Sequence, residues 1–125
     1  MNPADAGRLG IRSGDVVSVH NERGSVLGGA YVTERIMPGA VYQDHGARVD
    51  AIVRGRGGLD RGGANNLICP SHTASDNTLA ENTNGFLVNV AKVDVERLAA
   101  EHPEEFGRDY HPEAGLQISA WIAGE

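Results

Sequence analysis

Side chains that hydrogen-bond neutral ligands are concentrated in one stretch of the chain, between Arg54 and Phe86. The first ten residues of this stretch hold five of the seventeen glycines. Ten amide and hydroxyl side chains follow: Asn65, Asn66, Ser71, Thr73, Ser75, Asn77, Thr78, Asn82, Thr83 and Asn84. Such side chains match the donors and acceptors of a polar or phosphorylated ligand, and glycine lets the backbone come close to it. The stretch therefore predicts either a ligand-binding surface or a long surface loop made of turn-forming residues.

Residues that usually carry catalysis or bind metals do not form a complete site in this sequence. The five histidines are scattered, without the spacing of metal ligands on a helix: His20, His45, His72, His102 and His111. Ser71 beside His72 does not make a nucleophile and its base, and we expect Cys69 to be a buried structural thiol. Gly55 to Gly58 is not a phosphate-binding loop, because no strand is predicted before it and no helix after it. The pattern indicates a binding module with neither catalytic nor metal-ligating residues of its own.

Length and charge predict the domain organisation. The 125 residues are enough for one modest core, and 40% apolar residues is ordinary for a globular domain. Acidic and basic residues balance over residues 1–93, so residues 94–125 carry the whole net charge of −6. An acidic tail argues against a nucleic-acid partner, and no apolar run is long enough to insert into a membrane. We predict one domain over residues 1–93 and a C-terminal helix with an acidic tail over residues 94–125.

The elements that would position the polar stretch begin with a short helix and a β-hairpin. Asn2 is the expected N-cap of the helix and Gly10 its C-terminal cap. Strands are predicted over residues 16–20 and 25–33, joined by a turn in which Gly24 takes a positive φ. The Gly28–Gly29 pair within the second strand predicts a bulge or a sharp bend, as at the corner of a small barrel.

Short strands are expected on both sides of the polar stretch and inside it. Pro38–Gly39 predicts a type II turn, after which residues 40–43 are expected to form a strand. Residues 66–69 predict a short buried strand, and residues 85–93 the last one. The tail begins with a helix over about residues 95–101, capped by Asp94. Its remaining apolar residues are expected to dock on a surface outside this domain: Phe106, Tyr110, Leu116, Ile118, Trp121 and Ile122.

Gly24–Ser25 leaves one enzymatic alternative open. Pyruvoyl-dependent aspartate decarboxylases are similarly short, share the small β-barrel that these elements predict, and cleave themselves at a Gly–Ser bond. The residues around this bond differ from those of that family, and Gly–Ser after a charged turn is also ordinary in a hairpin. An intact mass near 13.2 kDa would exclude self-cleavage.

The order of these motifs resembles the molybdopterin-dinucleotide-binding domain that closes the large subunit of the dimethyl sulfoxide reductase family of molybdenum and tungsten enzymes. The pattern of that family is met at Asn2, Pro3, Asp5, Ala6, Gly10, Ile11, Gly14, Asp15, Val17, Asn21, Arg23, Gly24, Val32, Thr33, Pro38 and Gly39. The segments GGANNL and TNGFLVNVAKV also fall where the family has its second asparagine motif and its last barrel strand. GGLDRGGANNLICPSH is most similar to the transhydroxylase and catechol dehydroxylase branch.

The resemblance implies a mainly β fold, a six-stranded double-psi β-barrel with a few short helices, that contacts one of two molybdopterin guanine dinucleotides. By position, Asn65 and Asn84 would hydrogen-bond the pterin. Further cofactor-binding residues implied by the resemblance are Asn66, Thr83, Gly85, Phe86 and His45. Neutral amides suit this role because they match both donors and acceptors without leaving a charge buried when the ligand is absent.

The resemblance also implies that the chain is one part of an oxidoreductase and inactive by itself. The metal ligand and the catalytic residues of the family lie in other domains, so Cys69 would not bind the metal. Expected partners are the remaining domains of the same large subunit, with an iron–sulfur subunit as a further candidate. The alternative from another class is a stand-alone double-psi barrel that serves as a protein-interaction module.

Overall fold

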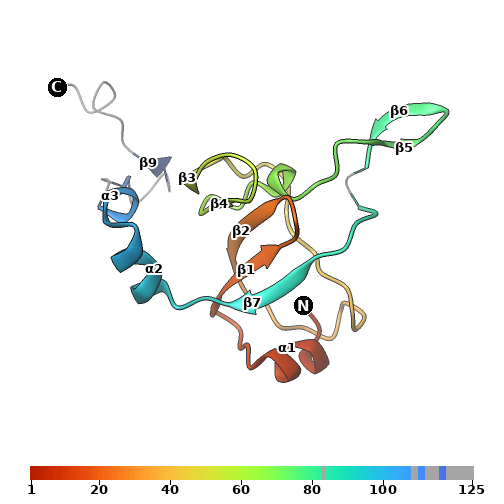
Figure 1. Cartoon of the computed structure of the whole chain (residues 1–125). Coiled ribbons are helices and arrows are strands. Elements are labelled where there is room, and N and C mark those ends of the chain that lie inside the picture. Colours follow the sequence, from red (N-terminus) through yellow and green to blue (C-terminus); the bar gives the residue numbers. More distant parts are fainter. Residues whose placement is uncertain (83, 108–109, 112–115, 118–125) are drawn as a thin grey trace. The chain divides into compact units, whose positions relative to one another are not determined.

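The computed structural model describes residues 1–82, 84–107, 110–111 and 116–117. The chain forms two compact units, Met1–Val93 and Asp94–Glu125. In the first unit, short helices accompany a β-sheet (Figure 1). Thr83 and the apolar tail residues from position 118 onward lie outside the described residues.

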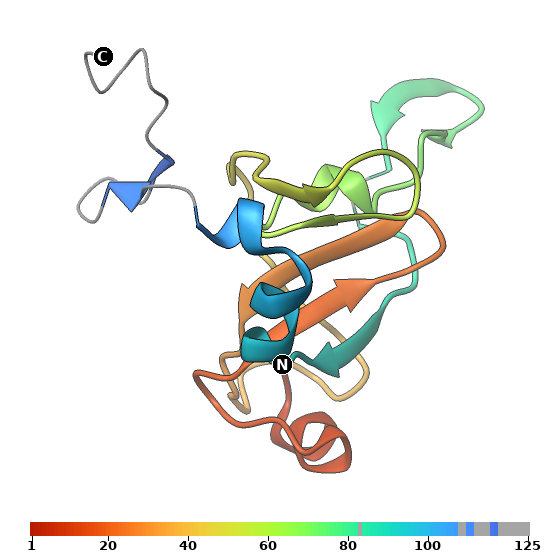
Figure 2. The ribbon, with the colours of Figure 1, turned by 60° about the vertical axis from the view of Figure 1, so that its left-hand side comes forward.

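Five strands of the first unit form one mixed sheet in the order β3–β4–β2–β1–β7. Their bounds are β1 (Val16–His20), β2 (Gly24–Gly29), β3 (Ala51–Val53), β4 (Gly58–Asp60) and β7 (Asn89–Lys92). The pair β2–β4 is parallel, and the other neighbours are antiparallel (Figure 2). In the part of the chain that the structure describes, the sheet is open, with β3 and β7 at its edges. The mainly β class is confirmed, whereas these residues form neither a closed barrel nor a six-stranded sheet.

The hairpin of β1 and β2 supplies four of the ten buried apolar residues in the described part of the chain. Val17 and Val19 are buried, while the residues between and beside them are partly exposed, as expected of a strand with one face toward the core. Pairing runs without interruption from Val16 opposite Gly29 to His20 opposite Ser25. The expected bulge at Gly28–Gly29 is therefore absent from this pairing, and a register shift occurs instead between β3 and β4.

Two strands that the sequence predicted are not formed. Residues 40–43 lie between two glycines with left-handed backbone, Gly39 (φ 81°) and Gly46 (φ 94°), and have no regular structure. Residues 66–69 are not a strand either, because the chain turns into a 3-10 helix, η1 (Asn65–Leu67). The last strand is shorter than the predicted range of residues 85–93, since regular pairing is limited to β7.

The first helix, α1 (Pro3–Leu9), begins and ends where the sequence predicted. Asn2 Oδ1 accepts the Ala4 N–H at 2.9 Å, and Gly10 closes the helix with a φ of 66°. One apolar cluster joins this helix to the sheet and contains Ala6, Ile11, Val17 and Ala30. A second cluster lies farther along the sheet and contains Val19, Val26 and Ile68, with Phe86 and Val88 packed against it.

The polar stretch is not one long loop. Strand β3 lies directly before the glycine-rich run, so the prediction that no strand precedes this run is wrong. Strand β4 lies within the run, and η1 follows it. A separate hairpin follows, made of β5 (Thr73–Ser75) and β6 (Thr78–Glu81). In both views this hairpin lies apart from the five-stranded sheet (Figures 1 and 2).

The second unit begins with helix α2 (Val95–Glu101), whose bounds match the prediction. Asp94 Oδ1 accepts the Arg97 N–H at 3.0 Å, as expected of an N-cap. Helix α3 (Pro103–Phe106) and the short pair β8 (Tyr110–His111) and β9 (Leu116–Gln117) follow. None of the helices in the described ranges has the length and apolarity to cross a bilayer.

Candidate functional site

A cleft of about 370 Å³ brings together four of the predicted site residues. They come from three segments of the first unit: His45 from the loop at residues 39–45, Asn65 from η1, and Asn84 and Phe86 from the segment before β7. Two other predicted residues, Asn66 and Gly85, do not line it, and Thr83 lies outside the described residues. The amides of Asn65 and Asn84 thus face one cleft although they are far apart in the sequence.

Asn65 is carried by a turn that the core holds in place. The Asn65 carbonyl accepts the N–H groups of Ile68 at 3.0 Å and Cys69 at 3.2 Å, which closes the turn. Ile68 is only 2% exposed and packs in the second apolar cluster. The Asn65 side chain makes no hydrogen bond within the described part of the chain, so its amide is available to a ligand.

Asp60 fixes the entry to this turn. Its carboxylate is 1% exposed and accepts the N–H of Asp50 at 2.6 Å and of Ala64 at 2.8 Å. Ala64 is the residue that precedes η1, so Asp60 holds the start of the turn that carries Asn65. No sequence pattern indicates this role, because a single aspartate in a glycine-rich run is ordinarily exposed.

Gly24 provides the surface against which η1 packs. Its φ is not positive, so the expected turn conformation is wrong. A Cβ atom at this position would lie 2.9 Å from Leu67 Cγ and 3.1 Å from the Gly58 carbonyl oxygen. Glycine is therefore required here because of close packing. Ser25 is an ordinary strand residue opposite His20, which favours the hairpin interpretation of the Gly24–Ser25 pair.

Asn84 is carried by a more exposed segment. Asn82 Oδ1 accepts the Gly85 N–H at 2.9 Å and so closes the turn on which Asn84 lies. Phe86 and Val88 then anchor the segment against the second apolar cluster. The Asn84 side chain is exposed and makes no hydrogen bond among the described residues.

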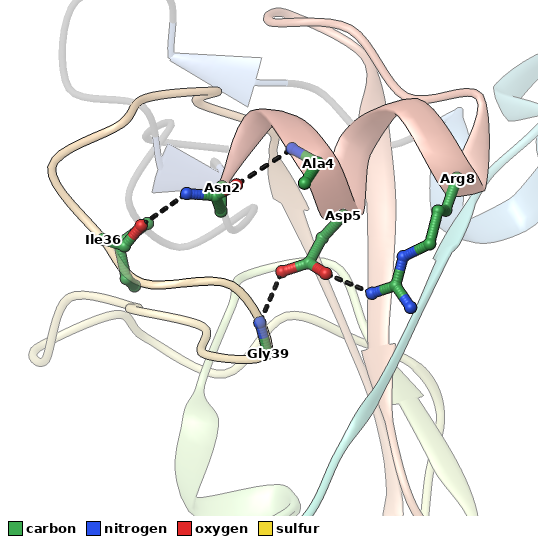
Figure 3. Close-up of polar contacts among 6 residues, drawn as sticks. All are labelled: Asn2, Ala4, Asp5, Arg8, Ile36 and Gly39. Atoms are coloured by element: carbon green, nitrogen blue, oxygen red, sulfur yellow. Dashed lines mark hydrogen bonds and ion pairs between the residues drawn. The ribbon is translucent and has the colours of Figure 1, made fainter.

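The third side of the cleft is held from α1. Asp5 Oδ2 accepts the Gly39 N–H at 2.7 Å, and Asn2 Nδ2 donates to the Ile36 carbonyl at 2.8 Å (Figure 3). Arg8 pairs with the other oxygen of Asp5. The Gly39 N–H, and then the Arg8 guanidinium, hold the pKa of the Asp5 carboxyl below its ordinary value of 3.8. The N-terminal motif therefore anchors the loop that carries His45.

The cleft has no carboxylate, lysine or arginine among its lining residues. Besides the residues already named, the lining is apolar or neutral: Val19, Gly39, Ala40, Val41, Tyr42, Gln43, Ile68, Leu87 and Val88. Asp44 accepts the Tyr42 hydroxyl at 2.7 Å and raises the pKa of this tyrosine, which keeps it neutral. No group of His, Cys, Asp or Glu suited to hold a metal ion occurs among the described residues. The site can therefore bind a neutral polar group, but it offers no acid–base pair.

A larger cavity, of about 830 Å³, contains none of the predicted amides. Its lining shares Tyr42 and Gln43 with the cleft and includes the charged residues Arg35 and Asp44. Volume alone does not identify a binding site. The smaller cleft is the better candidate, because Asn65 and Asn84 both line it and neither side chain has a hydrogen-bond partner among the described residues.

Comparison with known proteins identifies the family of the chain. The sequence model of a protein family described as the Molydopterin dinucleotide binding domain matches residues 1–85. The chain belongs to this family. Its cofactor is a molybdopterin dinucleotide, and the neutral cleft with its amides fits the pterin part, which presents a row of donors and acceptors.

Curated relatives of the chain include a trimethylamine-N-oxide reductase and a hydroxytransferase. Trimethylamine-N-oxide reductase of Salmonella typhi is 44% identical over 69 residues, which is 55% of this chain and 7% of the relative. The pyrogallol hydroxytransferase large subunit of Pelobacter acidigallici is 35% identical over 95 residues, which is 75% of this chain and 11% of the relative. The chain thus spans about a tenth of the length of the relatives that it matches.

Proposed function

We propose that this domain is the C-terminal cofactor-binding domain of a molybdenum oxidoreductase that carries two molybdopterin guanine dinucleotides. It holds one of the two dinucleotides, while the metal ligand and the catalytic residues belong to other domains, so the isolated domain is inactive. The observation that supports this most directly is the convergence of Asn65 and Asn84 on one neutral cleft. When bound, the cofactor supplies the redox chemistry through its metal.

In this proposal each predicted residue has a distinct task. Asn65 and Asn84 exchange hydrogen bonds with the edge of the pterin, because an amide offers a donor and an acceptor side by side. Phe86 forms an apolar wall, and His45 faces the ligand from the loop at residues 39–45. Asn66, Thr83 and Gly85 are neighbours of the site whose side chains or backbone contact the cofactor less directly.

We also propose that the sheet is completed to a six-stranded double-psi barrel in the full subunit. Two observations support this: the outer edges of β3 and β7 are unpaired in the described part of the chain, and the matched segment covers only 7% or 11% of a relative. Several large apolar side chains are also strongly exposed: Tyr31 70%, Met37 73%, Tyr42 75%, Val49 73% and Leu87 91%. Such side chains suit contact with the remaining domains of the subunit.

The test uses the full-length oxidoreductase that contains this domain. Asn65→Ala and Asn84→Ala are expected to lower the pterin and molybdenum content per protein, because each removes hydrogen bonds to the cofactor. Asn77→Ala is the matched control, since the same amide is removed at an exposed position between β5 and β6, outside the cleft lining. Unchanged cofactor content in both cleft variants would reject the proposal. Equal losses in all three variants would reject the assignment of the site to this cleft.

A further inference from the structure

One side chain outside the cleft lining contacts both of the segments that carry the cleft amides. Asn21 lies in the turn between β1 and β2, and its Nδ2 donates to the Ile68 carbonyl at 2.8 Å. The same nitrogen lies 3.5 Å from the Leu87 carbonyl oxygen, a longer and weaker contact. An amide nitrogen carries two hydrogens, so it can face both carbonyls at once.

The two carbonyls occupy equivalent places relative to the predicted recognition residues. Ile68 follows η1, three residues after Asn65, and Leu87 stands three residues after Asn84. They are separated from Asn21 by 47 and 66 residues along the chain. A contact of this kind therefore fixes two distant segments against one common point.

Asn21 is itself held in a defined orientation. Its Oδ1 accepts the Arg23 N–H at 2.9 Å, and its backbone N–H donates to the Gly24 carbonyl at 3.0 Å. The Gly24 backbone next to it packs against Leu67, within η1. The Asn21 side chain is thus oriented by its own turn, and its amide nitrogen holds the Ile68 and Leu87 carbonyls relative to that turn.

We infer that Asn21 is a positioning residue that sets the separation of Asn65 and Asn84. This inference rests on the proposed function, because the separation matters only if both amides grip one ligand. Only a neutral amide serves here, since the side chain must accept from Arg23 and donate to two carbonyls. A carboxylate of the same shape keeps the first bond, but its oxygens would face the two carbonyl oxygens and repel them.

The experiment compares full-length enzymes that carry Asn21→Asp or Asn21→Ser. Both variants can still accept the Arg23 N–H. Aspartate has no donor for Ile68 and Leu87, and the serine hydroxyl is one bond too short to take the place of the Asn21 amide nitrogen. We expect the pterin dinucleotide to dissociate on the order of tenfold faster at temperatures well below unfolding. If Asn21→Asp does not fold, Asn21→Ser decides the question, because it places no charge beside the carbonyls.

A second measurement separates positioning from a general loss of stability. In the cofactor-free enzyme, backbone amide hydrogens of residues 65–69 and 84–88 should exchange faster together in the Asn21 variants. Ser13→Ala is the matched control, because Ser13 Oγ likewise accepts a backbone hydrogen bond from a distant residue, Val32, at 2.9 Å. It lies outside the cleft lining and should change neither exchange in these segments nor cofactor release.

The outcomes distinguish this inference from the proposed function. If Asn65→Ala and Asn84→Ala release the cofactor but the Asn21 variants retain it, the positioning role is rejected and the proposed function stands. If none of the four variants affects retention, the proposed function itself fails. If the Asn21 variants only lower the unfolding temperature, with unchanged exchange in the two segments, Asn21 has a structural role alone.

Discussion

The two segments that carry the cleft amides are built very differently. The Asn65 turn starts at a buried carboxylate, packs its Leu67 against backbone, and ends in the core at Ile68. The Asn84 segment is closed by one local hydrogen bond, donated by the Gly85 N–H to Asn82 Oδ1, and is anchored only after the amide, by Phe86 and Val88. One side of the cleft is therefore fixed by tertiary contacts, and the other is held mainly by local ones.

This difference shows how such a site can combine order and adaptability. A rigid side lowers the entropy that a ligand must remove on binding, because the Asn65 amide is already in place. An exposed side with few tertiary contacts opens at a lower free energy and can close over the ligand. We therefore expect substitutions around Asn65 to act on the stability of the domain, and those at Asn84 to act on the ligand alone.

The largest expected effect is that of Asp60→Ala on the fixed side. This substitution leaves the N–H groups of Asp50 and Ala64 without their buried acceptor. We expect a loss of about 3 kcal/mol in the free energy of unfolding, measured by urea denaturation of this chain. Asp76→Ala, at an exposed position between β5 and β6, is the control and should change stability by less than about 0.5 kcal/mol. Similar stability of the two variants would contradict the anchoring role of Asp60.

Gly24→Ala should have the next largest effect, because the new Cβ would meet Leu67 Cγ at 2.9 Å. We expect a loss of about 2 kcal/mol in unfolding free energy, again by urea denaturation. Gly28→Ala is the matched control on the same strand, since a Cβ there has nothing within 4 Å. The double variant Gly24→Ala with Leu67→Ala should lose less than the sum of the single changes, because the second removes the clash of the first. Strict additivity would show that Leu67 is not the residue that excludes a side chain at Gly24.

Local sequence signals predicted the parts of the fold that depend on neighbouring residues. The cap residues Asn2, Gly10 and Asp94 lie where side-chain chemistry indicated, because a helix end is decided within a few residues. The strand predicted over residues 16–20 is likewise confirmed by β1. The family resemblance predicted Asn65 and Asn84 as residues that bind the pterin, and in the structure both line one cleft.

Features that depend on distant contacts were not predictable from the sequence. The sequence predicts a positive φ for Gly24, whereas the structure requires glycine there because Leu67 packs against its backbone. Only the fold brings these two residues together. The segment at residues 66–69 has apolar residues suited to a strand, but it has no strand partner and Ile68 is buried after a 3-10 turn. The anchoring role of Asp60 shows no pattern in the sequence, because its partners lie 10 and 4 residues away. Asn21 belongs to the family pattern, but that pattern does not reveal its contacts 47 and 66 residues away.

The third side of the cleft should depend on pH through Asp5. Its pKa is lowered in the folded chain, so its bond to Gly39 stabilises the fold fully above the unfolded value near 3.8 and is lost as the pH falls through the lower folded value. Asp5→Asn should therefore be less stable than the parent at pH 7, with a difference that shrinks below about pH 4. Asp15, whose pKa is lowered by Lys92, acts equally in both proteins and cancels from the comparison. A difference that stays constant down to pH 2 would show that the Asp5 charge is not what anchors the loop.

The smallest expected effect on stability is that of the two recognition amides themselves. Asn65→Ala and Asn84→Ala should each change the unfolding free energy of this chain by less than about 0.5 kcal/mol, since neither side chain has a hydrogen-bond partner among the described residues. Urea denaturation of both variants beside Asp60→Ala measures this contrast directly. A large loss of unfolding free energy for Asn65→Ala would mean that the Asn65 amide stabilises its own turn. The rigid side would then have no amide available to bind the ligand. Small changes in unfolding free energy for both variants would instead show that the two sides of the cleft differ in how their backbone is anchored, and not in the contribution of their amides to stability.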